Sequence, residues 1–311
     1  MRILITGSNG LLGQHLIKLL KQNNNHRIIA TARGGNRLKD QNGYQYISLD
    51  ICDETQVKKV IADNVPDVII HCAAMTQVDD CEIKKEQCWR ANVLATQYLI
   101  KAAQQIKSSF LLVSTDFIFN GESGPYDENA LPDPLSYYGM SKLAAEMLLM
   151  TSQLRWAIAR TVLVYGIAED MSRSNIILWV KKSLEQGKKI RVVDDQWRTP
   201  TLVQDLAMGC QLITEKFLAN NDVDTNKISG IFNISGRDFL TPYEMALKTA
   251  DYFHLDKSLI EKADASSFTQ TAKRPPKTGF IIDKAGEMLG YKPHSFGEGI
   301  KIMGEELIAE K

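Results

Sequence analysis

Short apolar runs alternate with helical patterns over the first half of the chain. The runs have the length of strands and lie at residues 2–6, 27–32, 44–49, 67–72, 110–115 and 156–160. Between them, apolar residues recur at the spacing of one helix face, as at Leu16, Leu19 and Leu20 after the first run. Strands that alternate with helices over about 160 residues predict an α/β fold with a doubly wound parallel sheet of the Rossmann type.

The pattern changes after Tyr165-Gly166. Helical patterns follow near residues 176–186, 203–212 and 242–253, a strand pattern covers 231–235, and a proline-containing loop at 274–276 precedes a final helical region. Thr241 is placed to cap the helix that starts at Pro242. We therefore expect a Rossmann domain over residues 1–165 and a smaller α+β cap over 166–311. The boundary is soft, because segments of the second half can pack back on the first.

A glycine-rich turn joins the first strand to the first helix. Its glycines are spaced as G-x-x-G-x-x-G, one residue longer than the G-x-G-x-x-G fingerprint of dinucleotide sites. Gly7 permits a tight turn, Gly10 lets a diphosphate approach the backbone, and Gly13 lets helix and strand pack closely. We expect a dinucleotide to bind along Gly7, Asn9, Gly10, Leu11, Leu12 and Gly13. A glycine-rich turn without a ligand is the alternative.

The second strand ends in Arg33 and Arg37, where such folds usually place an acidic residue that binds ribose hydroxyls. No carboxylate there would repel a 2′-phosphate, and the arginines could pair with one. This favours NADPH over NADH, unless both arginines are only solvated. Asp50, after the third strand, would lie near the adenine edge or would cap the next helix. The small residues in the segment 73–76 would let a cofactor lie flat across the strand ends.

Tyr138 and Lys142 are four residues apart on a predicted helix that Ser136 is placed to cap. They therefore project from one face, one turn apart. We expect the ammonium to stabilise the phenolate and to lower the pKa of Tyr138 from its usual value of about 10. Such a phenol can donate a proton to an oxygen on which negative charge builds. The alternative is a surface lysine whose side chain extends past a tyrosine without a chemical role.

The strand at 110–115 ends in hydroxyls and a carboxylate, Ser114-Thr115-Asp116. Ligands of open α/β sheets bind beyond the carboxyl ends of the strands. Thr115 is therefore placed to hold a substrate carbonyl for Tyr138, and the second half of the chain would close over that substrate.

Charge and composition exclude several classes of function. Lys plus Arg equals Asp plus Glu at 37 each, and apolar residues make up 44%, so we expect no nucleic-acid or membrane partner. No apolar run approaches the roughly 20 residues of a membrane span, and the chain starts without a signal-peptide pattern. The five cysteines form no C-x-x-C pair and the five histidines lack metal-ligand spacing. We expect reduced thiols, no bound metal and a cytoplasmic location.

Taken together, these motifs resemble the extended short-chain dehydrogenase/reductase family and, within it, the dTDP-4-dehydrorhamnose reductases. The resemblance spans nearly the whole chain. Its motifs are Gly7-Ser-Asn-Gly-Leu-Leu-Gly13, Ala73-Ala-Met-Thr76, Ser114-Thr-Asp116 with Phe119 and Gly121, Tyr138-Gly-Met-Ser-Lys142, Asp195-Gln196 with Pro200-Thr201, and Arg274-Pro275. Most of these motifs are shared widely in the superfamily, but the Ser-Thr-Asp and Asp-Gln…Pro-Thr runs restrict the resemblance to the reductases.

The resemblance implies NADPH-dependent reduction of the 4-keto group of a nucleotide sugar, dTDP-4-dehydro-L-rhamnose to dTDP-L-rhamnose, with NADH possible. It implies a catalytic set of Thr115, Tyr138 and Lys142. Cofactor contacts would come from the glycine turn and from Arg33, Asp50, Ile51, Ala73, Ala74, Met75, Thr76, Tyr138 and Lys142. Thr115, Asp116 and Tyr138 would contact the sugar, and Arg274 is our candidate cation for the diphosphate, unless it is a surface arginine. A homodimer is compatible with the resemblance.

Some residues depart from the family pattern. Phe117 stands where the family usually has tyrosine, Trp197-Arg198 replaces a small, glycine-containing pair, and Met75 and Gln77 are atypical. These departures bear on the choice of sugar more than on the chemistry. Two other functions stay open: another nucleotide-sugar epimerase or ketoreductase, and a non-catalytic regulatory subunit, because the regulatory subunit of methionine adenosyltransferase resembles the same family. Co-purified NAD would favour an epimerase.

Overall fold

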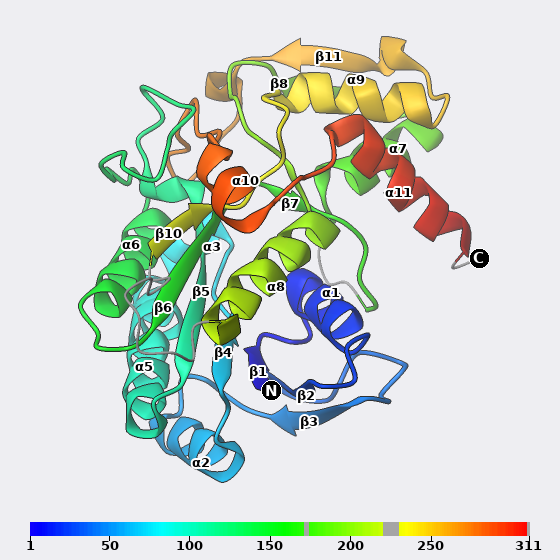
Figure 1. The fold of residues 1–311 in the computed structure, drawn as a ribbon. Helices are drawn as coiled ribbons and strands as arrows, with labels where there is room; N and C mark the ends of the chain where they lie inside the picture. The colour runs from blue at the N-terminus through cyan, green and yellow to red at the C-terminus, as the bar shows by residue number, and fades with distance from the viewer. Residues whose placement is uncertain (171–173, 220–229, 310–311) are drawn as a thin grey trace.

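Seven parallel strands form one sheet in the computed structural model, which describes residues 1–170, 174–219 and 230–309 (Figure 1). Their order is β10-β6-β5-β4-β1-β2-β3. The strands are β1 (Arg2–Thr6), β2 (Arg27–Ala32), β3 (Tyr44–Ser48), β4 (Val68–His71), β5 (Ser109–Thr115), β6 (Trp156–Thr161) and β10 (Gly230–Asn233). The predicted doubly wound parallel sheet is confirmed.

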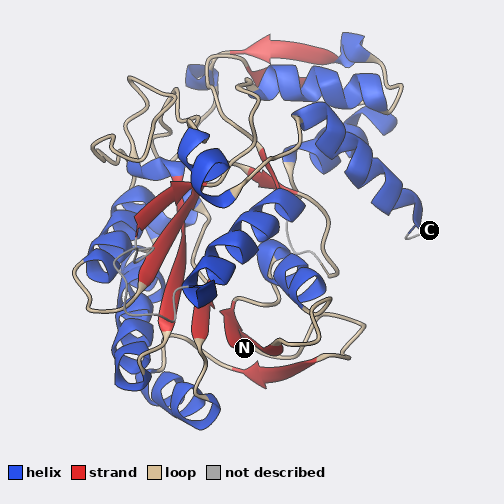
Figure 2. Cartoon of the chain, viewed as in Figure 1, coloured by secondary structure: helices blue, strands red, loops and turns tan. Residues whose placement is uncertain are grey.

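Helices cover both faces of this sheet (Figure 2). One face carries α1 (Leu11–Leu20), α8 (Val203–Ala219) and α10 (Asp283–Leu289), and the other carries α2 (Glu54–Asn64), α5 (Ala95–Ile106) and α6 (Tyr137–Met150). Neighbouring residues of a strand serve opposite cores: Ile3 packs in the cluster with Leu16, whereas Leu4 packs in the cluster with Leu99. Burial on both faces explains why the strands read as continuous apolar runs.

The second half of the chain contributes to two parts of the molecule. Strand β10 pairs with β6 and extends the main sheet, and α8 packs against α1. Other segments of the second half form a smaller unit. Its two parallel strands are β8 (Ile190–Val193) and β11 (Ile260–Ala263), and α7 (Ile176–Glu185) and α9 (Pro242–Tyr252) cover them. Figure 1 shows this unit beyond the carboxyl ends of the main strands, with α11 (Phe296–Ala309) beside it.

Local sequence signals fix several element boundaries. The predicted cap of α9 is confirmed: the Thr241 hydroxyl accepts a hydrogen bond from the Glu244 amide at 3.2 Å, and the Glu244 carboxylate accepts one from the Thr241 amide at 2.8 Å. Ser136 caps α6 by accepting from the Gly139 amide at 3.1 Å. Such caps satisfy amide groups that have no partner within the helix.

The chain leaves β1 toward β2 and β3, then returns to add β4 on the other side of β1. A crevice opens at the carboxyl ends of the strands where the order reverses in this way. The glycine turn follows β1, and the segment 73–76 follows β4, so both lie at this crevice. The short helices α3 (Val78–Ile83) and α4 (Lys85–Trp89) and the π-helical turn η1 (Arg90–Leu94) then lead into α5, and the 3-10 turn η2 (Asp116–Ile118) follows β5.

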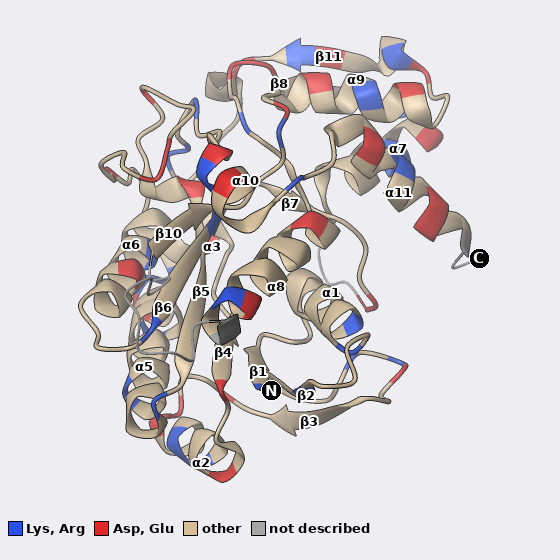
Figure 3. Cartoon of the chain, in the orientation of Figure 1, with Lys and Arg blue, Asp and Glu red and all other residues tan. Residues whose placement is uncertain are grey.

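The remaining described elements are β7 (Val164–Tyr165) and β9 (Thr201–Leu202), which pair with each other, and the 3-10 turns η3 (Lys257–Leu259) and η4 (Ala265–Ser267). Basic and acidic segments lie side by side on helices such as α2 and α9 (Figure 3). Within the described ranges, no helix is long and apolar enough to cross a membrane.

Candidate active site

The glycine turn has the geometry of a phosphate-binding turn. Gly7 takes a φ of 71°, and a Cβ on Gly13 would lie 2.4 Å from the Gly7 carbonyl oxygen, so both positions need glycine. Gly10 precedes α1, which has no side-chain cap and no acidic residue in its first turn. The amides of residues 11–13 therefore have no partner within the helix. Such amides, at the positive end of a helix dipole, bind phosphate.

The loop after β2 is tied to this turn. The Asn9 side chain donates to the Gly35 carbonyl at 2.8 Å and accepts from the Arg37 amide at 3.0 Å. Tyr46 donates to the Gly34 carbonyl at 2.8 Å. Arg33 is exposed beside these contacts. Asn9, predicted to contact the cofactor, thus serves to hold the loop that carries Arg33.

Asp50 lies at the end of β3 and does not cap the next helix. Its Oδ1 accepts from the Cys52 amide at 2.9 Å. The cap of α2 is Asp53, which accepts from the Thr55 and Gln56 amides at 3.0 Å each. The alternative role of Asp50 as a helix cap is therefore wrong, and its contact with adenosine stays a prediction.

A buried hydrogen-bond network supports the segment after β4. Thr96 donates to the Asn92 carbonyl at 2.7 Å, so its oxygen is left to accept from His71 Nε2 at 3.1 Å. His71 Nδ1 then accepts from the Thr6 hydroxyl at 2.7 Å, and Thr6 in turn accepts from the Ala73 amide at 3.2 Å. Burial lowers the pKa of His71 to about 3. His71 is therefore neutral and fixed as one tautomer between β1, β4 and α5.

Asn92 holds the next residues of this segment. Its Oδ1 accepts from the Met75 amide at 2.7 Å, and its Nδ2 donates to the Met75 carbonyl at 3.0 Å and to the Ser141 hydroxyl at 2.9 Å. Asn92 is buried in the π-helical turn η1. One side chain thus links the predicted cofactor segment 73–76 to the helix that carries Tyr138 and Lys142.

The structure brings Tyr138, Lys142 and Thr115 together at the carboxyl end of β5. A Cβ on Gly139 would lie 2.1 Å from the Phe117 carbonyl oxygen, so glycine there lets α6 approach η2 closely. Thr115 and Tyr138 come within hydrogen-bonding reach. The Lys142 ammonium donates to the Val113 carbonyl at 2.8 Å. All three side chains are buried.

The expected pKa of Tyr138 is wrong in direction. Burial raises the pKa of the phenol above its usual value, the hydrogen bond with Thr115 acts against that rise, and the charge of Asp116 adds to it. Burial also lowers the pKa of Lys142 to about 8, against the effect of Glu146. The loss of water around both groups is the largest influence on their pKa values, and the spacing of the two residues in the sequence does not reveal it.

Asp116 is bound by protein groups. Its carboxylate accepts hydrogen bonds from the Thr278 hydroxyl and from the Thr115 hydroxyl, the latter at 3.1 Å. Arg198 Nε lies 3.9 Å away. Burial raises the pKa of Asp116, and the Arg198 charge opposes that rise. Contact between Asp116 and a sugar stays a prediction.

Arg198, which departs from the family pattern, is buried and links two segments of the chain by hydrogen bonds. Its Nη1 donates to the carbonyls of Trp197 and Pro276 at 2.7 and 3.1 Å, and its Nη2 donates to Pro275 at 2.7 Å and to Gln196 at 3.3 Å. It thereby joins the loop before β9 to the segment 272–280, which we call the strap. The strap also pairs with the segment after η2, where the Lys277 amide donates to the Gly121 carbonyl at 3.1 Å.

Arg274, predicted to bind a diphosphate, is paired with Asp79 of α3. Arg274 Nη2 lies 2.6 Å from Asp79 Oδ2 and Nη1 lies 3.1 Å from Oδ1. Asp79 also accepts from the Ala272 amide at 2.9 Å. The hydrogen bonds to Arg274 hold the pKa of Asp79 below its usual range. The planar carboxylate occupies the fork that a phosphate would use.

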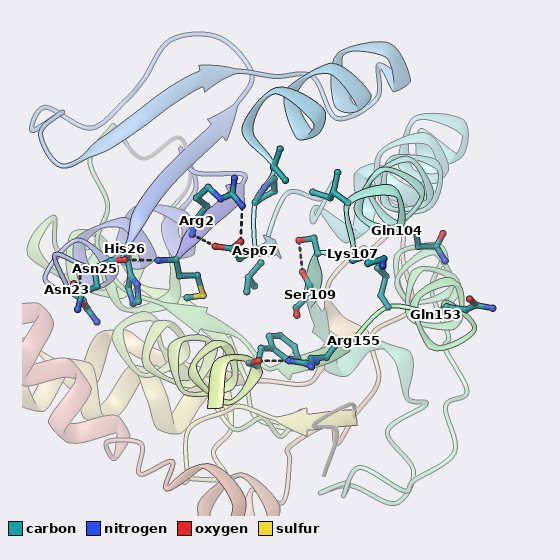
Figure 4. A pocket seen from close by; sticks show the side chains of 18 residues that line it. Arg2, Asn23, Asn25, His26, Asp67, Gln104, Lys107, Ser109, Gln153 and Arg155 are labelled. Carbon is teal, nitrogen blue, oxygen red and sulfur yellow. Dashed lines mark hydrogen bonds and ion pairs between the residues drawn. The ribbon is translucent and has the colours of Figure 1, made fainter. Parts of the chain in front are cut away.

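A hollow of about 1160 Å³ lies at the opposite, amino-terminal edge of the sheet (Figure 4). Arg2 and Asp67 pair across its wall at 3.1 Å, and Arg155 donates to the Phe217 carbonyl at 2.5 Å. None of the predicted site residues lines it. We therefore assign the chemistry to the carboxyl edge and not to this hollow.

Sequence reasoning missed three groups of the site. Asp79 and Arg198 act through partners far away in the sequence, which no local pattern indicates. Glu146 had a local signal, because it is the only charged residue in the run from 143 to 150. In the described parts of the chain, no group of three His, Cys, Asp or Glu residues is placed to hold a metal ion, and the five cysteines are free.

The chain matches one family model over nearly its whole length, the RmlD substrate binding domain, at residues 1–308. Methionine adenosyltransferase 2 subunit beta of Xenopus laevis is 35% identical over 257 residues, which are 83% of this chain and 73% of that protein. dTDP-4-dehydrorhamnose reductase of Aggregatibacter actinomycetemcomitans is 30% identical over 306 residues, which are 96% of this chain and 97% of that protein.

A solved structure of dTDP-4-dehydrorhamnose reductase from Bacillus anthracis, in complex with NADP, is similar with a TM-score of 0.80 at 26% identity, covering 98% of this chain and 99% of that chain. The similarity extends over both halves of the chain.

Gly10→Val tests the glycine turn. Gly10 has a φ of −82° and a ψ of 169°, which other residues adopt, and an added Cβ would meet only the Gly7 carbonyl, at 3.2 Å. We expect the variant to fold. The branched side chain would block the amides of residues 11–13, and loss of even one charge-assisted hydrogen bond of about 1.5–3 kcal/mol lowers dinucleotide affinity about ten- to a hundredfold.

Fluorescence titration with NADPH measures that affinity, and thermal unfolding measures the fold. Gly297→Val is the matched control, because it makes the same change on α11, where nothing lies within 4 Å of an added Cβ. We expect it to leave NADPH affinity unchanged. Normal affinity in a folded Gly10→Val protein would remove the turn from the phosphate site.

Proposed function

From the finding that this chain belongs to the RmlD substrate binding domain family of extended short-chain dehydrogenases/reductases, we propose that it is an NADPH-dependent reductase of 4-keto nucleotide sugars. The observation that carries the proposal is the meeting of Tyr138, Lys142 and Thr115 at the carboxyl edge of the sheet, beside the crevice that the glycine turn borders. The substrate that we propose is dTDP-4-dehydro-L-rhamnose, and the product is dTDP-L-rhamnose.

NADPH, when bound, supplies the hydride that adds to the carbonyl carbon. Tyr138 donates its phenolic proton to the carbonyl oxygen, which completes the alcohol. Because burial raises the pKa of Tyr138, the phenol carries this proton at neutral pH. Lys142, with a pKa of about 8, is mostly charged at pH 7 and stabilises the phenolate that remains. Thr115, whose one hydroxyl proton goes to Asp116 in this structure, would orient the carbonyl by donating to it instead.

The ends of the substrate meet different groups. Arg274 would bind the nucleotide diphosphate after exchanging Asp79 for it, and the strap would then hold the nucleotide beside α3. Phe117 lies beside Tyr138, with ring centroids 5.9 Å apart, and offers the sugar an apolar edge where a hydroxyl would stand in related reductases. Asp50, Ile51 and the segment 73–76 would contact the cofactor along the crevice.

A second function is favoured by one observation, the 35% identity with methionine adenosyltransferase 2 subunit beta. In that case the crevice would hold a dinucleotide without turnover, and the chain would act on a partner enzyme. The presence of all three members of the catalytic set favours the reductase, because a subunit without catalysis has no need for a buried lysine beside a buried tyrosine. Another ketoreductase or epimerase of nucleotide sugars would use the same residues on a different sugar.

Tyr138→Phe tests the proton donor. The change removes one hydroxyl from a buried ring, so we expect unchanged folding and NADPH affinity. Reduction of the 4-keto sugar should fall by about two to four orders of magnitude. Steady-state loss of NADPH absorbance measures the rate. Tyr137→Phe is the control, since Tyr137 packs against Trp89, and more than a tenth of wild-type turnover in Tyr138→Phe would exclude Tyr138 as the donor.

Arg33→Ala tests the choice of cofactor. A charge-assisted pair with the 2′-phosphate contributes about 1.5–3 kcal/mol, or roughly ten- to a hundredfold in affinity. We expect wild type to bind NADPH more tightly than NADH by this factor, and the variant to lose most of the difference without a change in NADH binding. Arg27→Ala, at the amino end of β2, is the control. Equal affinities in wild type would mean that Arg33 points to solvent.

A further inference from the structure

Glu146 is a fully buried carboxylate one turn beyond Lys142 on α6. None of its surface is exposed to solvent, and residues four apart on a helix are neighbours. An isolated buried charge costs far too much to persist. A buried carboxylate so close to Lys142 therefore requires a counter-charge.

Arg160 of β6 supplies the counter-charge. Its Nε lies 3.1 and 3.3 Å from the two Glu146 oxygens, and its Nη2 lies 2.7 Å from Oε2. The Arg160 side chain is only 3% exposed, and its guanidinium also lies over the Phe119 ring, 5.5 Å from the centroid. The pair joins α6 to the sheet beneath it and lets Glu146 stay charged in the interior.

Lys142 needs a negative neighbour. It is 4% exposed, and its ammonium donates a hydrogen bond to the uncharged Val113 carbonyl. Burial alone favours the neutral amine, and the Glu146 charge is the largest influence against that. Both groups lie on the same helix, while Arg160 approaches Glu146 from the strand.

Other groups face Lys142 from the neighbouring elements. His71 of β4 is neutral, because its pKa is about 3, and burial raises the pKa of the Cys72 thiol well above its usual value. Cys88 of α4 is hydrogen-bonded by Cys81, which lowers the pKa of Cys88 to about 7. Among the described residues, Cys72 and Cys88 are the other groups whose negative charge would favour a charged Lys142. Because burial keeps Cys72 a thiol, a test must separate Cys88 from Glu146.

We propose that Glu146, paired with Arg160, is a positioning residue that keeps Lys142 charged at this buried site. Lys142 can then stabilise the Tyr138 phenolate and hold the ribose hydroxyls of the cofactor. The proposal rests on the proposed function for its consequence in turnover. The charge state of Lys142 itself does not depend on that function, so the two can fail separately.

Glu146→Gln is the first test, because it removes the charge and keeps the shape and an oxygen for Arg160. An opposite charge one helical turn away, at an effective dielectric constant near 20, shifts a pKa by about one to two units. We expect the basic limb of the pH profile, for NADPH affinity and for turnover, to move down by that amount. At the wild-type midpoint the variant should retain roughly a tenth of the activity, and activity should recover at lower pH. A purely structural loss would lower activity equally at every pH.

A second readout needs neither cofactor nor substrate. The side-chain nitrogen resonance of Lys142, assigned by its absence in Lys142→Met, reports the midpoint of its titration. We expect a lower midpoint in Glu146→Gln and a smaller shift in Cys88→Ser. If Glu146→Gln does not fold, Glu146→Leu with Arg160→Met replaces the pair by apolar side chains, which buried pairs often tolerate, and the midpoint should again fall.

An unchanged Lys142 midpoint in the folded Glu146 variant would overturn the proposal. A larger shift in Cys88→Ser than in Glu146→Gln would also overturn it, because it would give the role to Cys88. If wild type reduces no sugar but the midpoint falls as expected, the proposed function fails and the assignment of Glu146 stands.

Discussion

The burial of the Lys142 ammonium is the constraint on which the rest of the site depends. A charged lysine in a buried site requires a hydrogen-bond acceptor and a negative neighbour. The Val113 carbonyl supplies the first, and Glu146 with Arg160 supplies the second. These contacts need α6 to lie close to the carboxyl ends of β5 and β6, and the same approach brings Tyr138 to Thr115.

Carboxylates also hold the strap, the segment that we propose binds the substrate. Asp79 and Asp116 each bind the strap, which comes from the second half of the chain. Arg198 completes this arrangement by binding two strap carbonyls. At Trp197-Arg198, where the chain departs from the family pattern, the strap is thus held by a buried arginine.

The parts that the sequence predicts well are those specified locally. The turn from Gly7 to Gly13 and the pair Tyr138–Lys142 depend on spacing within one turn or one helix, and both lie where spacing puts them. The ion pairs of Asp79 with Arg274 and of Glu146 with Arg160 join segments distant in the sequence, so no periodicity reveals them. The predicted direction of the Tyr138 pKa shift is wrong for the same reason, because burial is a property of the packed structure.

The central claim is that these residues reduce a ketone and do not merely bind a dinucleotide. Its most direct test is to mix the protein with NADPH and enzymatically prepared dTDP-4-dehydro-L-rhamnose, and to follow both NADPH absorbance and the sugar product. We expect oxidation of NADPH in step with formation of dTDP-L-rhamnose. Tight NADPH binding with no oxidation by this or any other 4-keto nucleotide sugar would contradict it and would favour a regulatory subunit.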